Sequence, residues 1–352
     1  MDFKHDLTYC FLTFLWSFVI TLFAMPSIIY MAHKKNILDK PNERTMHLEL
    51  TPRLGGIGIF AGFFSALTIF GDFKTDDLGV QMLLASSVIL FFIGLKDDII
   101  PVSVFKKFFI QVLASGIVVF FGHVRIESFY GFLGIGALEE GVSYGITFIV
   151  LIGLTNAINL IDGIDGLAGT IVLFISLVFG AGFLFGHSPY VFVAIALAGS
   201  LLAFLRYNFH DARIFMGDTG SLLSGFVLAV LAIKAIDLKI ENVNMPAMTL
   251  AVLVIPVVDT LRVFALRTLD GKSPFSPDKR HLHHLLSSFG LGSKIVVMLL
   301  LLVNLLFVIS VYYLGQTHSL TFLVFYIVAL VLVSLGGLFV VSRLFNRLKN
   351  ES

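Results

Sequence analysis

The sequence predicts an all-α, polytopic integral membrane protein with about eleven transmembrane helices. Of its 352 residues, 57% are hydrophobic and only 13% are charged. The mean hydropathy of +0.96 lies well above that of soluble proteins. Apolar runs also recur at the length of about 20 residues that a helix needs to cross a bilayer. We expect helices at 7–32, 54–71, 80–96, 104–122, 144–161, 167–186, 189–208, 219–236, 247–268, 294–315 and 319–342.

These segments form one transmembrane domain spanning residues 1–352, because no internal repeat, low-complexity tract or soluble domain interrupts them. The first apolar run is too long for a cleaved signal peptide, so we interpret it as a retained helix. The single cysteine, Cys10, provides neither a disulfide framework nor a cysteine-based metal site. The net charge of +1 gives no indication of a nucleic-acid partner.

Basic residues indicate how the chain is oriented. If the connections that follow odd-numbered helices share one side with the C-terminal tail, that side holds 19 of the 24 Lys and Arg residues. The positive-inside rule then places this side in the cytoplasm, with the N-terminus outside and the C-terminus inside. On the outer side, the glycine-rich and aromatic connection 123–143 predicts a small hairpin or a surface helix.

The most informative stretch is 155–169, between the fifth and sixth predicted helices. Asn156, Asn159, Asp162 and Asp165 recur every third residue, and a glycine follows each aspartate. An unbroken helix would rotate this row by roughly 60° per step. We therefore expect the helix to end near Asp162, so that the polar side chains converge. Polar groups at a membrane are costly and commonly functional, but a polar connecting loop is the other interpretation.

A second group of polar residues closes the third helix. Asp97 and Asp98 are adjacent, and Lys107 follows ten residues after Asp97. Two neighbouring carboxylates repel one another unless a cation joins them, and Mg²⁺ is the oxygen-seeking cation of phosphate chemistry. Lys107 could hold a phosphate oxygen. Solvated acids at a helix end would also explain the pair, and Pro101 stands where a prenyl-diphosphate motif would carry a third aspartate.

A third acidic residue, Asp218, precedes a long apolar run. It lies between Gly217 and Thr219, at the expected start of the eighth helix. Backbone N–H groups at a helix start favour phosphate, so Asp218 could be a metal ligand beside a phosphate site. An aspartate in this position could also simply cap the helix.

Basic residues gather in two of the cytoplasmic connections. The later one contains Lys279, Arg280, His281, His283 and His284. Zinc would suit His281 and His284 on one helix face, but no cysteine or zinc-protease motif accompanies them. Binding of a pyrophosphate group fits this set better.

The first cytoplasmic connection carries Arg44, His47 and Arg53, followed by Gly55. These bases could bind an anionic substrate, or they could reflect the positive-inside rule alone. Further along, Asp259 and Arg262 lie three residues apart in the ninth predicted helix, where they could pair with each other.

Taken together, carboxylates, amides, bases and glycines lie on connections of one membrane face, which favours phosphoryl transfer there. A lipid or sugar transporter is the alternative, although it would typically show repeat symmetry and polar groups at mid-membrane. A CDP-alcohol phosphotransferase would need an Ala-Arg pair and later aspartates that do not follow Asp165-Gly166. A purely structural scaffold leaves the aspartates unexplained.

The motifs at 156–169, 215–221 and 281–284 resemble the polyprenyl-phosphate N-acetylhexosamine-1-phosphate transferases, and the likeness covers nearly the whole chain. Within that family the His-Leu-His-His form is similar to the WecA/TagO branch rather than the MraY branch. The resemblance implies a multi-pass protein of the bacterial cytoplasmic membrane. It implies transfer of an N-acetylhexosamine 1-phosphate, most simply GlcNAc 1-phosphate, from a UDP-sugar to undecaprenyl phosphate, with release of UMP and initiation of a cell-surface glycan.

The same resemblance implies a role for each residue singled out above. The metal, Mg²⁺ or Mn²⁺, is expected on Asp218 and Asn159. The residues expected to act in catalysis are Asp97, Asp98, Asp162 and His284. Those expected to bind the substrates are Asn156, Asp165, Lys107, Arg280, His281, His283 and Arg53.

One departure from the family pattern lies in the first cytoplasmic connection. Relatives often have lysine after the arginine there, whereas Thr45 follows Arg44 in this chain, so a phosphate contact would move to Lys40 or Arg53. The acceptor phosphate is already largely dianionic at neutral pH, since its second pKa is about 6. A general base would therefore add little, and we favour direct displacement, with a two-step path left open. The sequence specifies neither the hexosamine nor whether the protein forms a homodimer.

Overall fold

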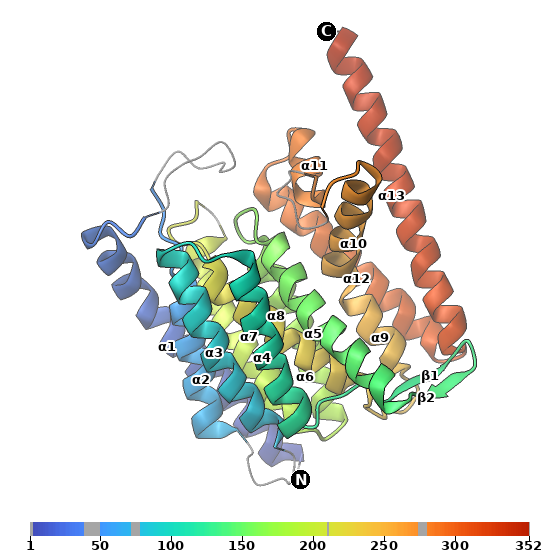
Figure 1. Ribbon diagram of the computed structural model, residues 1–352, viewed down its shortest axis with the longest axis horizontal. Coiled ribbons are helices and arrows are strands. Elements are labelled where there is room, and N and C mark those ends of the chain that lie inside the picture. The colour runs from blue at the N-terminus through green and yellow to red at the C-terminus, as the bar shows by residue number, and fades with distance from the viewer. Residues whose placement is uncertain (1–2, 39–49, 72–77, 210, 274–279, 352) are drawn as a thin grey trace.

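The computed structural model describes residues 3–38, 50–71, 78–209, 211–273 and 280–351. They form an all-α bundle with one small hairpin, which confirms the predicted fold class (Figure 1). The elements are α1 (Phe3–Lys34), α2 (Gly55–Phe70), α3 (Gly79–Ile99), α4 (Val104–Gly116), a π-helical segment (Ile117–Phe121), β1 (Ser128–Phe132), β2 (Ile135–Ala137), α5 (Glu140–Ile161), α6 (Leu167–Phe185), α7 (Tyr190–Asn208), α8 (Gly217–Ile236), α9 (Met245–Val252), α10 (Val254–Leu269), α11 (Leu282–Ser288), α12 (Ser293–Gly315) and α13 (Leu320–Glu351).

The predicted spans correspond closely to these helices. Among the described residues, nine helices are long and apolar enough to cross a membrane, and a tenth span results if α9 and α10 are counted as one. The apolar α2, at 16 residues, is shorter than the others. The exact number of eleven crossings therefore remains a prediction. The N-terminus lies at the end of the bundle opposite to α11 and the C-terminus (Figure 1).

The main difference from the predicted spans is a sharp bend in the ninth one. The axes of α9 and α10 meet at 63°. Pro256 lies just after the bend, and because proline lacks an N–H it cannot donate to the carbonyl of Val252 four residues earlier. The buried Asn304 of α12 donates to that carbonyl instead, at 3.0 Å. The carbonyl that proline leaves without a backbone donor is thus satisfied by a neighbouring helix.

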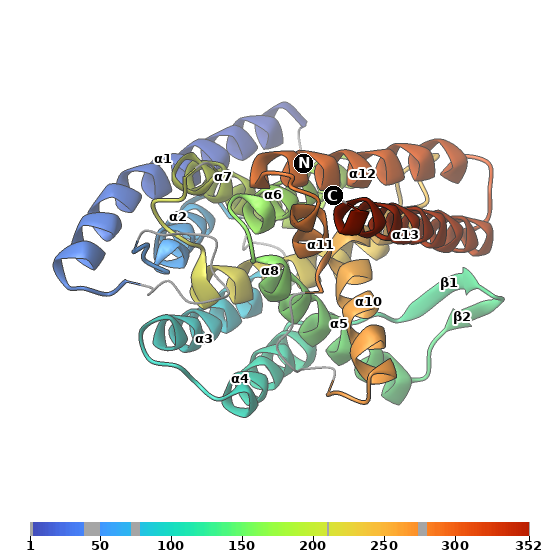
Figure 2. The same cartoon turned by 90° about the horizontal axis from the view of Figure 1, so that it is seen from above.

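Helix α8 forms the centre of the bundle, where α2, α3, α5, α6 and α7 pack around it (Figure 2). In the most apolar stretch of α8, 89% of the residues are buried inside the protein. The corresponding share in the peripheral α13 is 6%. Small residues allow close approach at its first turn: a Cβ on Gly56 would lie 2.2 Å from the nitrogen of Gly220, and one on Gly94 would lie 2.5 Å from the Cα of Thr219. Such small residues are typical of helix contacts in membranes.

The connection between α4 and α5 forms a hairpin, which is one of the two alternatives that the sequence left open. Strands β1 and β2 pair antiparallel, with Ser128 opposite Ala137. The turn rests on α13, because the Leu133 N–H donates to the Thr321 hydroxyl at 3.0 Å. The hairpin lies at the end of the bundle away from α11 (Figure 1), so it does not contribute to the site described next.

Candidate active site

The candidate site forms where α3 and α5 end and α8 begins, beside α11. Two connections far apart in the sequence are joined there by backbone hydrogen bonds. Phe215 N–H donates to the Pro52 carbonyl at 2.8 Å, Gly55 N–H to the Phe215 carbonyl at 2.9 Å, and Gly56 N–H to the Met216 carbonyl at 2.9 Å. This pairing fixes the start of α8 against the start of α2.

Asp98 caps the first turn of α8 from outside that helix. One carboxylate oxygen accepts the Asp218 N–H at 2.7 Å, and the other accepts the Thr219 N–H at 3.0 Å together with the Thr219 hydroxyl. The structure therefore gives the capping role to Asp98 and leaves the Asp218 side chain for other contacts. The backbone at Gly217 has a φ of +70°, and a Cβ there would lie 2.1 Å from the Arg53 carbonyl oxygen, so only glycine fits.

Lys107 lies between the two remaining carboxylates. Its Nζ is 2.8 Å from an oxygen of Asp218 and 3.2 Å from an oxygen of Asp97. The second Asp97 oxygen accepts the Val102 N–H at 2.6 Å. The amide nitrogen of Asn159 donates to the other Asp218 oxygen at 3.2 Å. Side chains from α3, α4, α5 and α8 thus meet in one cluster, and those of Lys107, Asp97 and Asp218 remain between 16% and 24% exposed.

This cluster fits the hard, oxygen-seeking Mg²⁺ that the sequence predicts. Asp97 and Asp218 offer carboxylates, and Asn159 offers an amide. No group of three or more His, Cys, Asp and Glu side chains suited to a metal occurs in the described part of the chain. That is compatible with Mg²⁺, which is commonly held by one or two carboxylates together with water and substrate phosphates. The roles of Asp218 and Asn159 as ligands remain predictions.

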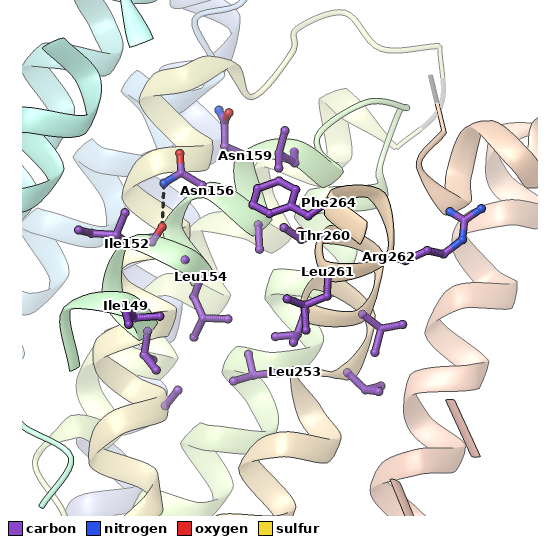
Figure 3. A pocket seen from close by; sticks show the side chains of 18 of the residues that line it. Ile149, Ile152, Leu154, Asn156, Asn159, Leu253, Thr260, Leu261, Arg262 and Phe264 are labelled. Carbon is purple, nitrogen blue, oxygen red and sulfur yellow. Dashed lines mark hydrogen bonds between the residues drawn. The ribbon is translucent and has the colours of Figure 1, made fainter. Parts of the chain in front are cut away.

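Asn156 is held by a partner that the sequence analysis missed. It exchanges two hydrogen bonds with Gln111 of α4, at 2.7 and 3.3 Å. Its amide also donates to the Ile152 carbonyl at 2.8 Å, the bond drawn in Figure 3. Gln111 is buried. An isolated glutamine inside an apolar span is the signal that could have identified it.

Beyond Asn159, the chain leaves the helix where the glycine pattern predicts. α5 ends at Ile161, and Asp162 is the half-buried residue that follows. Burial raises the pKa of Asp162 to about 7, and the nearby charges of Asp218 and Asp98 act in the same direction. This carboxyl therefore exchanges its proton near neutral pH.

Asp165 lies apart from the cluster around Asp218. It is buried, and its carboxylate accepts the Ala212 N–H at 3.1 Å. Asn208 joins the same two connections, accepting the Gly166 N–H at 3.0 Å and donating to the Ile214 carbonyl at 2.9 Å. These contacts tie the α5–α6 turn to the connection before α8. Of the expected row, Asn156 and Asn159 line the cavity, whereas Asp165 does not.

The histidines flank the cluster from α11. The His283 ring packs against the turn after α5, where a Cβ on Gly163 would lie 2.3 Å from its Nε2. His283 is 1% exposed, and neither ring nitrogen has a hydrogen-bond partner among the described residues. Burial lowers its pKa to about 3, with a smaller contribution from His284, whose ring centroid is 4.3 Å away. His283 is therefore a neutral imidazole.

The other basic residues are placed less centrally. Arg280 lies 2.6 Å from a carboxylate oxygen of Asp270. Arg53 is exposed, and its charge lowers the pKa of Asp162. The predicted phosphate contacts Lys40, Arg44, His47 and Lys279 lie outside the described residues.

A large cavity lies beside the cluster around Asp218 and is lined by Lys107, Asn159 and the histidines. It has a volume of about 1790 Å³ and both polar and apolar lining residues. Figure 3 shows Asn156 and Asn159 of α5 on one wall and Thr260, Leu261 and Phe264 of α10 on the facing wall. The polar lining residues are Lys107, Gln111, Asn156, Asn159, Thr249, Thr260, Arg262, Arg267, His281, His283 and His284. The apolar lining includes Val324, Ile327, Val328, Val331, Leu332 and Leu335 of α13.

The chain is similar to bacterial enzymes of one kind. A profile of glycosyl transferase family 4 matches residues 80–236. The probable undecaprenyl-phosphate N-acetylglucosaminyl 1-phosphate transferase of Bacillus subtilis is 32% identical over 84% of this chain and 82% of its own length. The decaprenyl-phosphate N-acetylglucosaminephosphotransferase of Mycobacterium tuberculosis is 31% identical over 81% of this chain and 77% of its own.

The undecaprenyl-phosphate alpha-N-acetylglucosaminyl 1-phosphate transferase of Escherichia coli O157:H7 is 30% identical over 75% of this chain and 72% of its own. The matched segment 80–236 contains the acidic pair at the end of α3, the asparagines of α5 and Asp218. The similarity thus extends over the part of the fold that builds the cluster around Lys107, and the chain belongs to glycosyl transferase family 4.

Proposed function

We propose that this protein transfers GlcNAc 1-phosphate from UDP-GlcNAc to undecaprenyl phosphate and releases UMP. The observation that carries the proposal is the cavity of about 1790 Å³, which joins bases and amides to an apolar wall on α13. One of those bases, Lys107, is also bound to the carboxylates of Asp97 and Asp218. A polyprenyl phosphate has the same division, with a charged head and a long apolar tail. The names of the relatives support the acceptor and the GlcNAc group.

The reaction we propose is a single displacement. An oxygen of the lipid phosphate forms a bond to the β-phosphorus of the donor, the bond from that phosphorus to the bridging oxygen breaks, and UMP takes the electron pair. Because the second pKa of a phosphate monoester is about 6, the attacking oxygen needs no strong base at neutral pH. Positioning and charge neutralisation then supply most of the rate enhancement.

The residues of the cluster divide this work. Lys107 is positioned to hold an acceptor phosphate oxygen, while Asp97 and Asp218 orient its ammonium group. Bound at Asp218 and Asn159, Mg²⁺ would neutralise charge on the diphosphate. His281, His283 and His284 line the same cavity and are assigned to the donor diphosphate and sugar. The neutral His283 offers a hydrogen bond rather than a positive charge.

We also propose that the protein lies in the cytoplasmic membrane of a bacterium, with this site on the cytoplasmic face. The support is the concentration of Lys and Arg on the connections that carry the site. Labelling of single cysteines, placed in a Cys10→Ser background at the described position Lys272 and at Glu241, tests this orientation. The cysteine of Lys272→Cys should react with an impermeant maleimide only in inside-out vesicles. The cysteine of Glu241→Cys should react only in right-side-out vesicles. The opposite pattern would contradict it.

The activity is tested with the purified full-length chain in detergent. UMP release is measured with undecaprenyl phosphate, Mg²⁺ and a panel of UDP-GlcNAc, UDP-GalNAc and UDP-glucose. We expect UMP only with the lipid and the metal together, and fastest with UDP-GlcNAc. Absence of UMP from a folded protein with every donor would refute the proposal.

Two variants test the assigned roles. Asp218→Ala should abolish Mg²⁺-dependent release of UMP, because the cluster loses a carboxylate shared by Lys107 and Asn159. His284→Ala should raise the KM for the nucleotide sugar. The matched control is His318→Ala, a histidine in the exposed α12–α13 turn at the other end of the bundle. If His318→Ala raised the KM for the nucleotide sugar as much as His284→Ala, this would contradict a site-specific role for His284.

A further inference from the structure

Helix α10 holds residues 280–282 through two side chains one turn apart. Asp259 is 2% exposed, and one of its carboxylate oxygens lies 2.9 Å from Nδ1 of His281. Its other oxygen accepts the Leu282 N–H at 2.8 Å. Arg262 donates to the Arg280 carbonyl oxygen at 2.7 Å. Three consecutive residues, 280–282, which we call the histidine segment, are thereby each hydrogen-bonded to α10.

The two side chains contact different parts of the segment 280–282. Arg262 extends from the side of α10 away from Asn156, toward the segment before α11. Their spacing of three residues would also allow Asp259 and Arg262 to pair with each other. In the structure, each has a partner on the histidine segment instead.

The contact between Asp259 and His281 determines which ring nitrogen is left for a ligand. An ionised carboxylate can only accept hydrogen bonds, so the proton of this contact is on Nδ1. The Nε2 atom is then the nitrogen available to the cavity that His281 lines. Both side chains are at least 95% buried, so water cannot readily replace either partner. A third group that fixes the ring and tautomer of a histidine is a general feature of catalytic sites.

We propose that Asp259 is a positioning residue: by accepting the Nδ1 proton of His281 it orients the ring and supports a second proton on Nε2, which donates to the diphosphate of the donor. Arg262 fixes the backbone on which His281 is carried. This inference rests on the proposed function, because it assigns the donor diphosphate to the cavity. Asp259 itself touches neither substrate. It acts through His281.

A purely structural role would assign Asp259 to capping α11 through Leu282. Two substitutions separate the roles. Asp259→Asn can keep an oxygen for the Leu282 N–H while placing an NH₂ donor opposite Nδ1, so Nδ1 loses its proton and only the proton on Nε2 remains. Asp259→Ala removes both contacts. Comparison of Asp259→Asn with Asp259→Ala therefore separates the effect on the protonation of His281 from the effect of losing the contact with the Leu282 N–H.

The kinetic test measures UMP release by the full chain in detergent. We expect Asp259→Asn to lower kcat by about 10- to 100-fold, the loss typical of outer partners of functional histidines, with less change in KM. In a His281→Ala background, the same substitution should cost less than about 2-fold, because the histidine it acts through is gone. A wild-type kcat in Asp259→Asn would overturn the proposal. So would a double variant in which Asp259→Asn lowers kcat by the same factor as it does in the wild-type background.

A spectroscopic test is independent of turnover. Magic-angle-spinning NMR of ¹⁵N-histidine-labelled protein in bilayers distinguishes a protonated from a bare ring nitrogen. The His281 signals are those lost in His281→Ala. We expect a protonated Nδ1 in the wild type and a bare Nδ1 in Asp259→Asn, and a bare Nδ1 in the wild type would overturn the positioning role. If no UDP-sugar yields UMP but the NMR result is as expected, the proposed reaction fails while the Asp259–His281 pairing stands.

Discussion

Replacing Asp98 with alanine should destabilise the protein strongly, because its carboxylate satisfies three buried donors at the start of α8. Leaving a buried donor unpaired costs about 1–3 kcal/mol. The three losses share one acceptor and are not additive, so we expect about 3–5 kcal/mol in total for Asp98→Ala. Asp98→Asn keeps one acceptor oxygen and should cost about half as much.

The assay is thermal unfolding of the purified variants in one detergent. At roughly 2.1 cal/mol/K per residue, a chain of 352 residues has an unfolding entropy of about 0.7 kcal/mol/K. A loss of 4 kcal/mol then lowers Tm by about 5 °C. Thr219→Val serves as the matched control, because it removes only the hydroxyl donor and should lower Tm by about 1–2 °C, at roughly 1 kcal/mol per hydrogen bond.

Thr219→Val should also have little further effect in the Asp98→Ala background, where the hydroxyl has already lost its acceptor. The result that would refute the reasoning is an Asp98→Ala protein with the wild-type Tm and no activity. Asp98 would then act as a reacting group, and its contacts with α8 would contribute nothing measurable.

Three further predictions follow from individual contacts. Gly217→Ala should lower stability by more than about 2 kcal/mol, because a φ of +70° and the Arg53 carbonyl leave no room for a Cβ; a normal Tm would contradict this. Stability should fall by about 1.4 kcal/mol per pH unit as the pH drops from 6.5 toward 3, because the unfolded chain protonates His283 while the folded chain, with a pKa of about 3, does not. This part of the slope should disappear in His283→Leu, and an unchanged slope would exclude His283 as its cause. Gln111→Leu should cost about 1–2 kcal/mol by leaving Asn156 with unpaired amide groups, as measured by Tm, whereas the Gln111→Leu, Asn156→Leu double variant should lose no more than the single one.

Much of the fold and part of the site were predictable from local pattern. Span lengths follow from the runs of apolar residues, and the end of α5 before Asp162 follows from the glycines after it. The glycines and aromatic residues of 123–143 allowed a hairpin or a surface helix, and the structure has the hairpin. The bend at Leu253 was not predicted, although Pro256 marks it, because proline within a membrane helix is tolerated when a neighbour such as Asn304 replaces the lost bond.

The roles of neighbouring polar residues could not be read from the chain alone. Asp97 and Asp98 are adjacent and chemically identical, yet one pairs with Lys107 and the other caps α8, because they point in different directions from the end of α3. Asp165 continues the spacing that begins at Asn156, but the turn after α5 directs it to Ala212 instead of the cavity.

By itself, the sequence determined that the chain crosses a membrane many times and which residue types can handle phosphate and a cation, because apolar length and polar chemistry are local properties. Only the tertiary structure decided which of those residues meet. The cluster of Asp97, Lys107, Asn159 and Asp218 joins four helices, and the Asp259–His281 pair joins α10 to α11. Such contacts depend on helix packing, which brings together residues as far apart in the sequence as Lys107 and Asp218, separated by 111 positions.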